Sequence, residues 1–332
     1  MAVDMTQKPI LVVKDLNVHY DTGKGPAKAV NDVPFSLRPG ERLGLIGESG
    51  SGKTTMATAL MRLTRAPGRI VSGSVELDGQ DLLKLSDKDL REVRLRDIAL
   101  MPQGAMSSLN PVMRLEEQMI DAIVAHVPNL KRPELDARVQ QLLKQVGLAP
   151  EVARRYPHEL SGGMKQRAAM AIATSLSPKV IVADEPTSAL DVVVQRQVMQ
   201  TLGRLQDGLG AAVVLIGHDM GLIAQFADIV GVMYAGKIVE SAPVDALFAD
   251  PQHPYTIGLL GSIPRIEVDR ERLSTIEGSV PSPNNQPKGC RFAPRCPFAD
   301  PRCHLEPPPL RDLGPEHRVA CWKAPVELAR AA

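Results

Sequence analysis

Eight residues near the start of the chain have the types and spacing of a phosphate-binding loop. They fit the pattern G-x-x-x-x-G-K-[ST] and are Gly47, Glu48, Ser49, Gly50, Ser51, Gly52, Lys53 and Thr54. Glycines let backbone N–H groups wrap around phosphates at the start of a helix. We expect Lys53 to reach the β- and γ-phosphates, Thr54 to place its hydroxyl on Mg²⁺, and Thr55 to add a phosphate contact. The alternative, a chance glycine-rich turn, does not explain the complete motif.

Two adjacent carboxylates follow an apolar run further along the chain. Asp184 and Glu185 come directly after Val180–Ala183, and ligands of open α/β sheets bind at such strand ends. Asp184 is predicted to hold the Mg²⁺ shell through water, and Glu185 to orient or deprotonate the water that attacks the γ-phosphate. The alternative is that the pair only caps the next helix. The phosphate loop upstream favours catalysis.

A second set of backbone donors is predicted at Leu160–Arg167. There Ser161, Gly162 and Gly163 precede a helical stretch and could bind another phosphate. One chain with a single phosphate loop has no obvious need for a second anion site. We therefore expect these residues to contact a nucleotide that another subunit holds.

The elements that must position these residues read as an α/β fold. A half-buried strand is expected over 10–20, and a short strand at 42–46 should run through the loop into a helix over 53–65. The apolar runs 180–183 and 212–216, each followed by a helix-like segment, predict buried parallel strands. The stretch 114–147 looks helical and is interrupted by Pro128 and Pro133.

The composition changes after about Glu240. Residues 251–332 contain 14 of the 28 prolines, all four cysteines and the single tryptophan, so little long regular structure is expected there. We predict a nucleotide-binding domain over 1–250, with a helical subdomain at about 104–175, and a small cysteine- and proline-rich C-terminal domain over 251–332.

Length and charge restrict the class of protein. The 332 residues, 44% of them hydrophobic, can bury a sizeable core, and a net charge of +1 gives no basic surface of the kind that nucleic-acid binders carry. We expect no nucleic-acid partner. No signal sequence is recognised at the start, and no apolar run approaches the roughly 20 residues that span a bilayer. The chain is expected in the cytoplasm, with membrane contact through partner proteins.

Together these motifs resemble the nucleotide-binding subunit of an ATP-binding cassette (ABC) transporter. Residues 47–54 resemble the Walker A motif, 180–185 the Walker B motif and 160–166 the signature motif, which includes Gln166. The remaining family positions match in order. They are Gln103, which resembles the Q-loop glutamine that senses Mg²⁺ and contacts the membrane subunits, the D-loop Asp191, the switch His218 and the adenine-stacking Tyr20. The resemblance implies a P-loop ABC ATPase in which Glu185 and His218 are catalytic, with ATP and Mg²⁺ bound.

The same resemblance implies the partners. Two cassettes bind head to tail, so we expect a second ATPase subunit, favoured as a heterodimer, which completes the site on this chain. Two transmembrane permeases and an extracytoplasmic solute-binding protein are also implied. The chain would then be peripheral on the cytoplasmic face of the inner membrane. A soluble ABC-type switch on DNA or ribosomes is the alternative from another class, and the single cassette without long coiled-coil insertions argues against it.

Two further stretches narrow the branch. Met106–Pro111 and His253–Thr256 resemble the dipeptide, oligopeptide and nickel importers. His-Pro-Tyr is a weak motif that could simply start a helix, but its place after the cassette and before a cysteine-bearing tail favours this family. We therefore expect import of di- or oligopeptides. Import of nickel or another small solute is the alternative.

The four cysteines suggest a metal centre. Cys290, Cys296, Cys303 and Cys321 are separated by five, six and seventeen residues. A cytosolic protein seldom keeps disulfides, so four thiols in a small domain point to a metal. The gaps lack the C-x₂-C pairs of zinc ribbons, and four cysteines also suit a [4Fe–4S] cluster, which some of the peptide-importer relatives carry. We favour the cluster over Zn²⁺, and both over buried free thiols.

Overall fold

The computed structural model describes residues 4, 6–262 and 276–326, so 263–275 and 327–332 of the predicted C-terminal domain lie outside the described residues. The chain forms two compact units, each assembled from separate stretches. Unit 1 comprises Met1–Val12, Ser36–Arg42 and Val75–Gly217, and unit 2 comprises Val13–Phe35, Leu43–Ser74 and His218–Ala332. Both contain helices and strands, which confirms the α/β prediction.

Three parallel strands form the core of unit 1. They are β6 (Ile98–Met101), β7 (Val180–Asp184) and β8 (Ala212–Ile216). β7 lies between the other two, with Val180 opposite Ile98 and Asp184 opposite Ile216. Every residue of β7 and β8 is buried, as expected for apolar runs covered on both faces. The predicted parallel strands are confirmed, and the last residue of β7 is the carboxylate Asp184.

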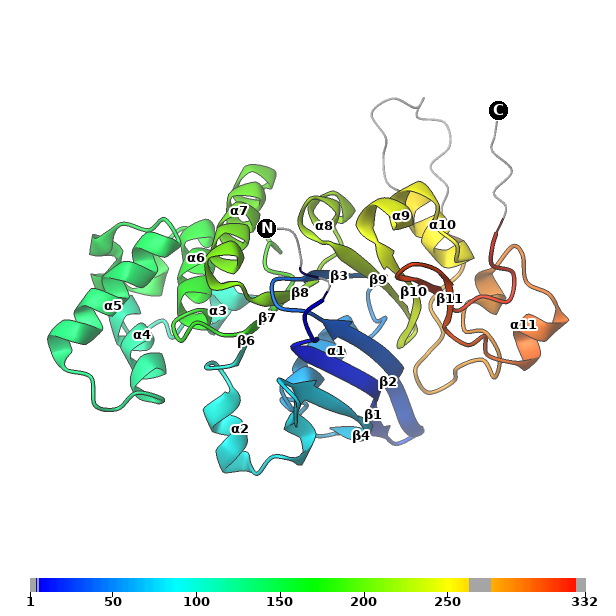
Figure 1. Ribbon diagram of the computed structural model, residues 1–332, viewed down its shortest axis with the longest axis horizontal. Helices are drawn as coiled ribbons and strands as arrows, with labels where there is room; N and C mark the ends of the chain where they lie inside the picture. The colour runs from blue at the N-terminus through cyan, green and yellow to red at the C-terminus, as the bar shows by residue number, and fades with distance from the viewer. Residues whose placement is uncertain (1–3, 5, 263–275, 327–332) are drawn as a thin grey trace. The chain divides into compact units, whose positions relative to one another are not determined.

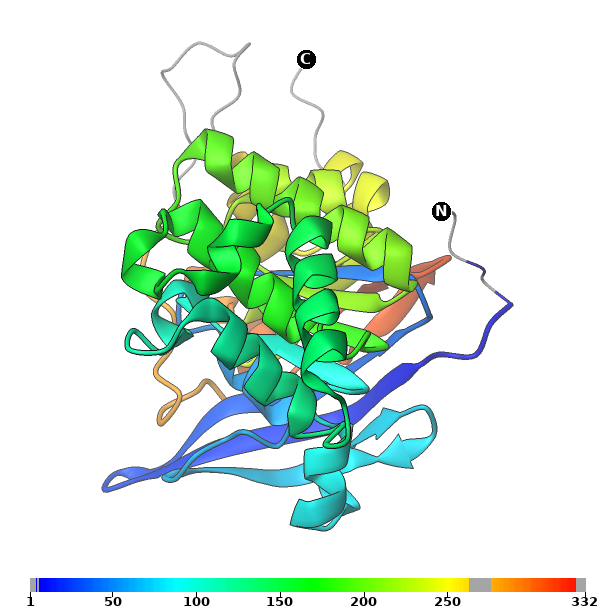
Figure 2. The same cartoon turned by 90° about the vertical axis from the view of Figure 1, so that its left-hand side faces the viewer.

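The helices of unit 1 include the predicted helical stretch. They are α2 (Asp87–Val93), α3 (Ala105–Ser108), α4 (Leu115–Val124), α5 (Arg132–Gln145), α6 (Gly162–Ala173) and α7 (Val192–Leu209). α4, α5 and α6 pack against one another and appear as the group of green helices in Figures 1 and 2. The predicted interruption of the helical stretch is confirmed between Val124 and Arg132, where Pro128 lies, but the role expected of Pro133 is wrong. Pro133 does not interrupt a helix, because it lies in the first turn of α5, where no backbone N–H is needed.

Unit 2 contains most of one sheet and part of another. The first has β1 (Leu11–Thr22) between β2 (Gly25–Leu37) and β4 (Gly68–Leu77), and the end of β4 that belongs to unit 1 pairs with β5 (Gln80–Asp81). The second runs in the order β11 (Arg311–Gly314), β12 (His317–Val319), β10 (Lys237–Pro243), β9 (Ile229–Tyr234) and β3 (Arg42–Ile46). β3 is parallel to β9, with Ile46 opposite Val232. The strands predicted over 10–20 and 42–46 are confirmed.

The helices of unit 2 are short. They are α1 (Lys53–Leu60), α8 (Met220–Phe226), α9 (Val244–Ala249), α10 (Pro254–Gly261) and α11 (Pro301–Leu305). The helix expected over 53–65 ends at Leu60 instead, because Arg62 takes a left-handed φ of 52° and turns the chain away. Within the described part of 251–332 the longest helix, α10, has eight residues, which confirms the expectation of little long regular structure.

Short 3₁₀ helices also occur at Leu82–Lys84, Pro150–Arg154, Pro157–Glu159 and Ala293–Arg295. Among the described helices, none combines the length and the apolar character that a membrane span requires.

Gly52 provides a test of the turn between β3 and α1. Its φ is 102°, and a Cβ atom there would overlap the carbonyl oxygen of Ala29. We expect Gly52→Ala to lower the free energy of unfolding by about 1–3 kcal/mol, because both the backbone strain and the overlap oppose the native turn. Thermal unfolding without nucleotide measures this effect.

Gly208→Ala is the matched control. Gly208 lies in α7, and nothing surrounds the position of its Cβ. Alanine there should leave stability unchanged or raise it by up to about 1 kcal/mol, because alanine favours helix. Equal losses in both variants would contradict this account of Gly52.

Candidate nucleotide site and cysteine cavity

The phosphate loop is the turn between β3 and α1. Gly47 takes a φ of 146°, and a Cβ there would overlap the carbonyl oxygen of Met233, so only glycine fits. The buried Ser51 accepts a 2.9 Å hydrogen bond at its carbonyl from the N–H of Gly236. The loop is therefore held by the backbone of the segment that joins β9 to β10.

Lys53 is the first residue of α1, and its ammonium group lies within the loop. Nζ donates to the carbonyl oxygens of Gly47, at 2.7 Å, and Glu48, at 3.0 Å, and lies 3.3 Å from Oγ of Ser51. The side chain is 7% exposed. A largely desolvated cation at a helix N-terminus attracts anions strongly, and this is the chemistry that the phosphate loop needs.

Tyr20 lies beside the start of α1. Its hydroxyl is 3.4 Å from Oγ1 of Thr55, and a Cβ at Gly68 would lie 2.7 Å from its ring. The ring is half-buried. The structure therefore places Tyr20 next to Thr55 in the first turn of α1, directly after the phosphate loop.

The carboxylates of unit 1 lie at the end of β7. Asp184 is buried, and Glu185 takes a left-handed φ of 49° while its N–H donates to the carbonyl of Ile216 at 2.9 Å. Nε2 of Gln103, which follows the neighbouring strand β6, donates to Oε2 of Glu185 at 2.9 Å. An uncommon backbone conformation at a strand end and an amide donor both fix the direction of this carboxylate.

The signature residues cap α6. Oγ of Ser161 accepts the N–H of Met164 at 3.3 Å, and Gly162 and Gly163 form the first turn. A Cβ at Gly163 would lie 2.5 Å from Cγ1 of Val194, so α7 closely approaches this turn. The same Val194 donates its N–H to the D-loop carboxylate of Asp191 at 3.0 Å.

The two capping side chains are exposed, whereas Gln166 is buried, with Nε2 unpartnered. Ser161 and Asp191 thus lie at neighbouring helix starts that face solvent.

The predicted site residues divide between the two units. Unit 1 contains Gln103, Ser161, Gly162, Gly163, Gln166, Asp184, Glu185 and Asp191. Unit 2 contains Tyr20, residues 47–55, His218 and the four cysteines. His218 is exposed, directly before the start of α8.

The four cysteines line one small cavity of unit 2. They share it with apolar and aromatic neighbours that include Phe292, Ala293, Pro254 and Trp322. All four are free thiols. Burial raises the pKa of Cys290 and Cys321, and raises that of Cys296 to about 11. Burial therefore favours the protonated form of Cys290, Cys296 and Cys321, and a bound metal would have to displace their protons.

Among the described residues, the arrangement of the cysteines around this cavity shows no preformed metal site. Across residues 4, 6–262 and 276–326, no three His, Cys, Asp or Glu side chains form a group that could hold one metal ion. The cysteines nevertheless meet backbone donors, such as the N–H of Lys323, 3.4 Å from Sγ of Cys321.

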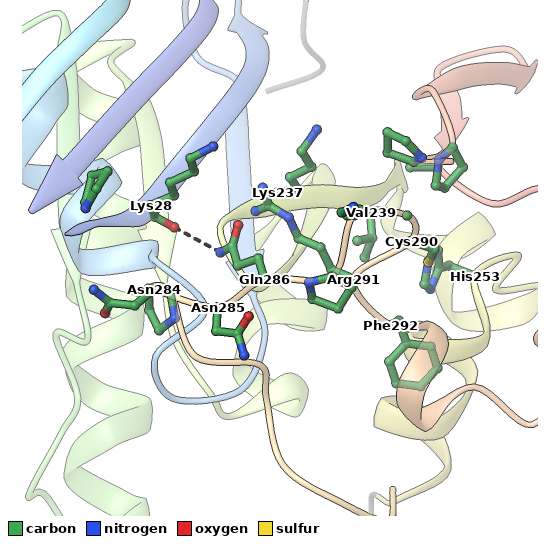
Figure 3. Close-up of a pocket in the computed structure, with 18 residues that line it drawn as sticks. Lys28, Lys237, Val239, His253, Asn284, Asn285, Gln286, Cys290, Arg291 and Phe292 are labelled. Carbon is green, nitrogen blue, oxygen red and sulfur yellow. Dashed lines mark hydrogen bonds between the residues drawn. The ribbon is translucent and has the colours of Figure 1, made fainter. Parts of the chain in front are cut away.

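A second, larger cavity of about 410 Å³ adjoins the cysteines. Figure 3 shows Cys290, His253 and Phe292 on one side of it and Gln286, which donates to the carbonyl of Lys28 at 3.0 Å, on the other. Arg291 lies between them and donates to the carbonyl of Ala235. Burial lowers the pKa of Arg291 to about 10, so its guanidinium remains charged at neutral pH.

The His-Pro-Tyr motif has a structural role that the sequence did not reveal. Nδ1 of His253 accepts the N–H of Tyr255 at 3.0 Å and caps α10, and burial lowers the pKa of this histidine to about 3. The buried carboxylate of Glu240 accepts the N–H groups of Gln252 and His253 and bonds to Nε2 of His317. The motif is thus fixed in position as a neutral, fully packed turn.

Tyr255 and Arg295 contact the phosphate loop, which we did not predict. The hydroxyl of Tyr255 accepts the N–H of Glu48 at 2.8 Å, and Nη1 of Arg295 lies 3.1 Å from the Glu48 carboxylate. The only sequence signal was the weak His-Pro-Tyr motif itself.

Comparisons with known proteins agree with these motifs. Residues 30–188 match the family described as ABC transporter, and residues 239–303 match the oligopeptide/dipeptide transporter C-terminal region. The chain is 42% identical to the oligopeptide transport ATP-binding protein AppD of Bacillus subtilis, over 94% of this chain and 96% of AppD. It is 44% identical to the oligopeptide transport ATP-binding protein OppD of Escherichia coli, over 96% and 94%.

A solved structure shares the fold. It is the dimeric ATP-binding cassette MJ0796 bound to ADP and Pi, with a TM-score of 0.64 and 28% identity, which covers 70% of this chain and 98% of that one. The described strands, phosphate loop and helices, taken with these relatives, show that the chain belongs to the ABC transporter family, among the ATP-binding proteins of its dipeptide and oligopeptide branch.

Proposed function

We propose that this chain binds and hydrolyses ATP to energise the import of di- or oligopeptides. The observation that carries the proposal is the buried ammonium of Lys53 inside a glycine loop at the start of α1. The names of AppD and OppD and the match to their C-terminal region support peptides as the cargo. We further propose a cassette over 1–250, a helical subdomain at about 104–175 and a C-terminal domain over 251–332.

In this mechanism the backbone N–H groups of the phosphate loop and Lys53 bind the phosphates of ATP. The ring of Tyr20 stacks on adenine. Mg²⁺, when bound, would neutralise phosphate charge, and Thr54 and Asp184 carry the oxygens that would hold it. Glu185, directed by Gln103, accepts a proton from the attacking water, and His218 contacts the γ-phosphate.

The exposed cap of α6 supports a site shared between two subunits. Ser161 and the N–H groups of Gly162 and Gly163 contact the nucleotide of the opposing subunit, and Gln166 and Asp191 support this surface. ATP then binds both subunits only when they are closed, so its binding favours closure. We propose a second, different ATPase subunit as the partner, together with two permeases and an extracytoplasmic binding protein. The chain is peripheral, on the cytoplasmic face of the membrane.

We also propose that the cysteine cavity holds a [4Fe–4S] cluster. Support comes from four cysteines around one apolar cavity and from backbone N–H groups near sulfur, which tune such clusters. Within residues 4, 6–262 and 276–326, no three His, Cys, Asp or Glu side chains form a preformed group that could hold a metal ion, so the proposal rests on the shared cavity and its backbone donors. When bound, the cluster would cross-link and stabilise the C-terminal segment, which has too few apolar residues to build a large core.

Glu185→Gln tests the catalytic assignment. The variant should bind MgATP with wild-type affinity and lose about 100-fold or more in turnover, because the amide cannot accept the proton of water. Nucleotide binding and phosphate release, measured with the partner subunit present, separate the two effects. Turnover near the wild-type rate would contradict the assignment.

Gln103→Ala tests the direction of Glu185. Without its amide donor the carboxylate is less well oriented, so kcat should fall about tenfold or more while KM for ATP changes little. Gln140→Ala, on the exposed side of α5, should leave both parameters unchanged. A rise in KM with unchanged kcat would instead place Gln103 in nucleotide binding.

Metal analysis after purification without oxygen tests the cluster. We expect about four iron and four sulfide per chain, with visible absorption, and loss of both in Cys303→Ser. Zinc at one equivalent would support the alternative. Neither iron with sulfide nor zinc at stoichiometric level would contradict any metal role for the cysteines.

A further inference from the structure

The C-terminal region holds the phosphate loop through one residue, Glu48. The hydroxyl of Tyr255 accepts the Glu48 N–H at 2.8 Å. Nη1 of Arg295 lies 3.2 Å from Oε1 and 3.1 Å from Oε2 of the Glu48 carboxylate. Backbone and side chain of the same loop residue are therefore both bound by residues more than 200 positions later in the chain.

The two side chains that hold Glu48 are themselves rigidly fixed. Tyr255 is fully buried, and the side chain of Arg295 is 6% exposed. The guanidinium also donates from Nε to the carbonyl of Glu277 at 2.9 Å and from Nη2 to the carbonyl of Ile276 at 3.2 Å. The planar guanidinium group is thus held by hydrogen bonds to two backbone carbonyls. An arginine held in this way loses little further conformational entropy when it binds a carboxylate.

An aromatic cluster joins these two residues. The rings of Tyr234 and Tyr255 are 4.5 Å apart, and Phe292 packs against both, at 5.3 and 5.5 Å. The hydroxyl of Tyr234 lies 3.3 Å from Nη1 of Arg295. Phe292 and Arg295 lie on the segment between Cys290 and Cys296. This packing ties the cysteine-bearing segment to the end of β9.

Glu48 is also directly connected to Lys53. The carbonyl of Glu48 accepts a hydrogen bond from Nζ of Lys53 at 3.0 Å and another from the N–H of Ser51 at 3.2 Å. A shift of the Glu48 peptide would therefore move an acceptor of the lysine and alter the curvature of the loop. Phosphate binding by backbone N–H groups depends on that curvature.

We propose that Tyr255 and Arg295 are positioning residues for ATP, because they hold the phosphate loop of their own chain in its binding shape through Glu48. The inference rests on the proposed function that this loop binds ATP. It assigns the C-terminal region a part in nucleotide affinity. It also accounts for the tyrosine of His-Pro-Tyr, whose hydroxyl is aimed at the loop.

The test uses the full chain with the variants Tyr255→Phe and Arg295→Gln. Each should raise the Kd for MgATP by at least about fivefold, the lower end of typical coupling between sites. In the assembled transporter KM for ATP should rise while kcat at saturating ATP stays close to wild type. A purely structural role would not produce this split between KM and kcat.

Three comparisons sharpen the test. Arg302→Gln removes an arginine that stacks on Trp322 and pairs with Glu306, away from the loop, and should leave the Kd unchanged. Arg295→Lys should restore only part of the affinity, because an ammonium lacks the fork. Glu48→Ala should weaken binding as Arg295→Gln does, and the double variant should be no weaker than either single variant.

Tyr255→Phe keeps the ring and removes one oxygen, so it guards against misfolding as the cause. Wild-type Kd in both Tyr255→Phe and Arg295→Gln would overturn the inference. If Arg302→Gln raised the Kd for MgATP as much as Tyr255→Phe and Arg295→Gln do, the inference would be overturned too. If the wild-type chain itself fails to bind MgATP, the proposed function is contradicted. If the wild-type chain binds MgATP and every variant binds it equally well, only the inference about Tyr255 and Arg295 is contradicted.

Discussion

The hydrogen bonds from the Lys53 ammonium to the carbonyl oxygens of Gly47 and Glu48 are the interaction on which the phosphate loop depends. They form at the turn where α1 begins. In the proposed function, Lys53 lies inside the loop to neutralise phosphate charge, and the loop keeps its N–H groups available for the same anion. Such a turn is strained without support. Glycine at 47 and 52 permits it, and the carbonyl oxygens of Met233 and Ala29 limit its shape. Ser51 ties it to Gly236.

Unit 1 contains the pair of side chains to which the proposed function gives the catalytic role. Parallel strands bring their carboxyl ends to one edge, so Gln103 after β6 and Glu185 after β7 meet there at 2.9 Å. Glu185 has a left-handed φ of 49°, so the extended conformation of β7 ends before this residue. At the start of α6 the cap of Ser161 leaves a solvent-facing helix end.

The parts that could be predicted from the sequence are those set by local chemistry. The phosphate loop needs glycines and a lysine at fixed spacing, and fully buried parallel strands need uninterrupted apolar runs such as 180–183. The end of α1 at Leu60 was not predictable in this way, because the left-handed turn at Arg62 carries no glycine to mark it. Pro133 was misinterpreted because a proline breaks a helix when it lies in the helix interior but is well tolerated in the first turn, where Pro133 lies.

Contacts between distant segments were the hardest to predict. The hydrogen bond from Glu48 to Tyr255 joins residues 207 positions apart, and nothing in the local pattern of either segment specifies it. The common cavity of the four cysteines was suggested by their number, whereas their poor fit to a single ion depends on three-dimensional spacing. Helix and strand periodicity does not determine such spacing.

The central claim, that residues 47–54 form a preformed phosphate site, is tested most directly by a high-resolution structure of the full chain with Mg²⁺ and a non-hydrolysable ATP analogue. The account predicts the β- and γ-phosphates within the loop, in contact with Nζ of Lys53 and the N–H groups at the start of α1, and little movement of Glu48. A nucleotide bound elsewhere, or a loop that must refold around the phosphates, would contradict it.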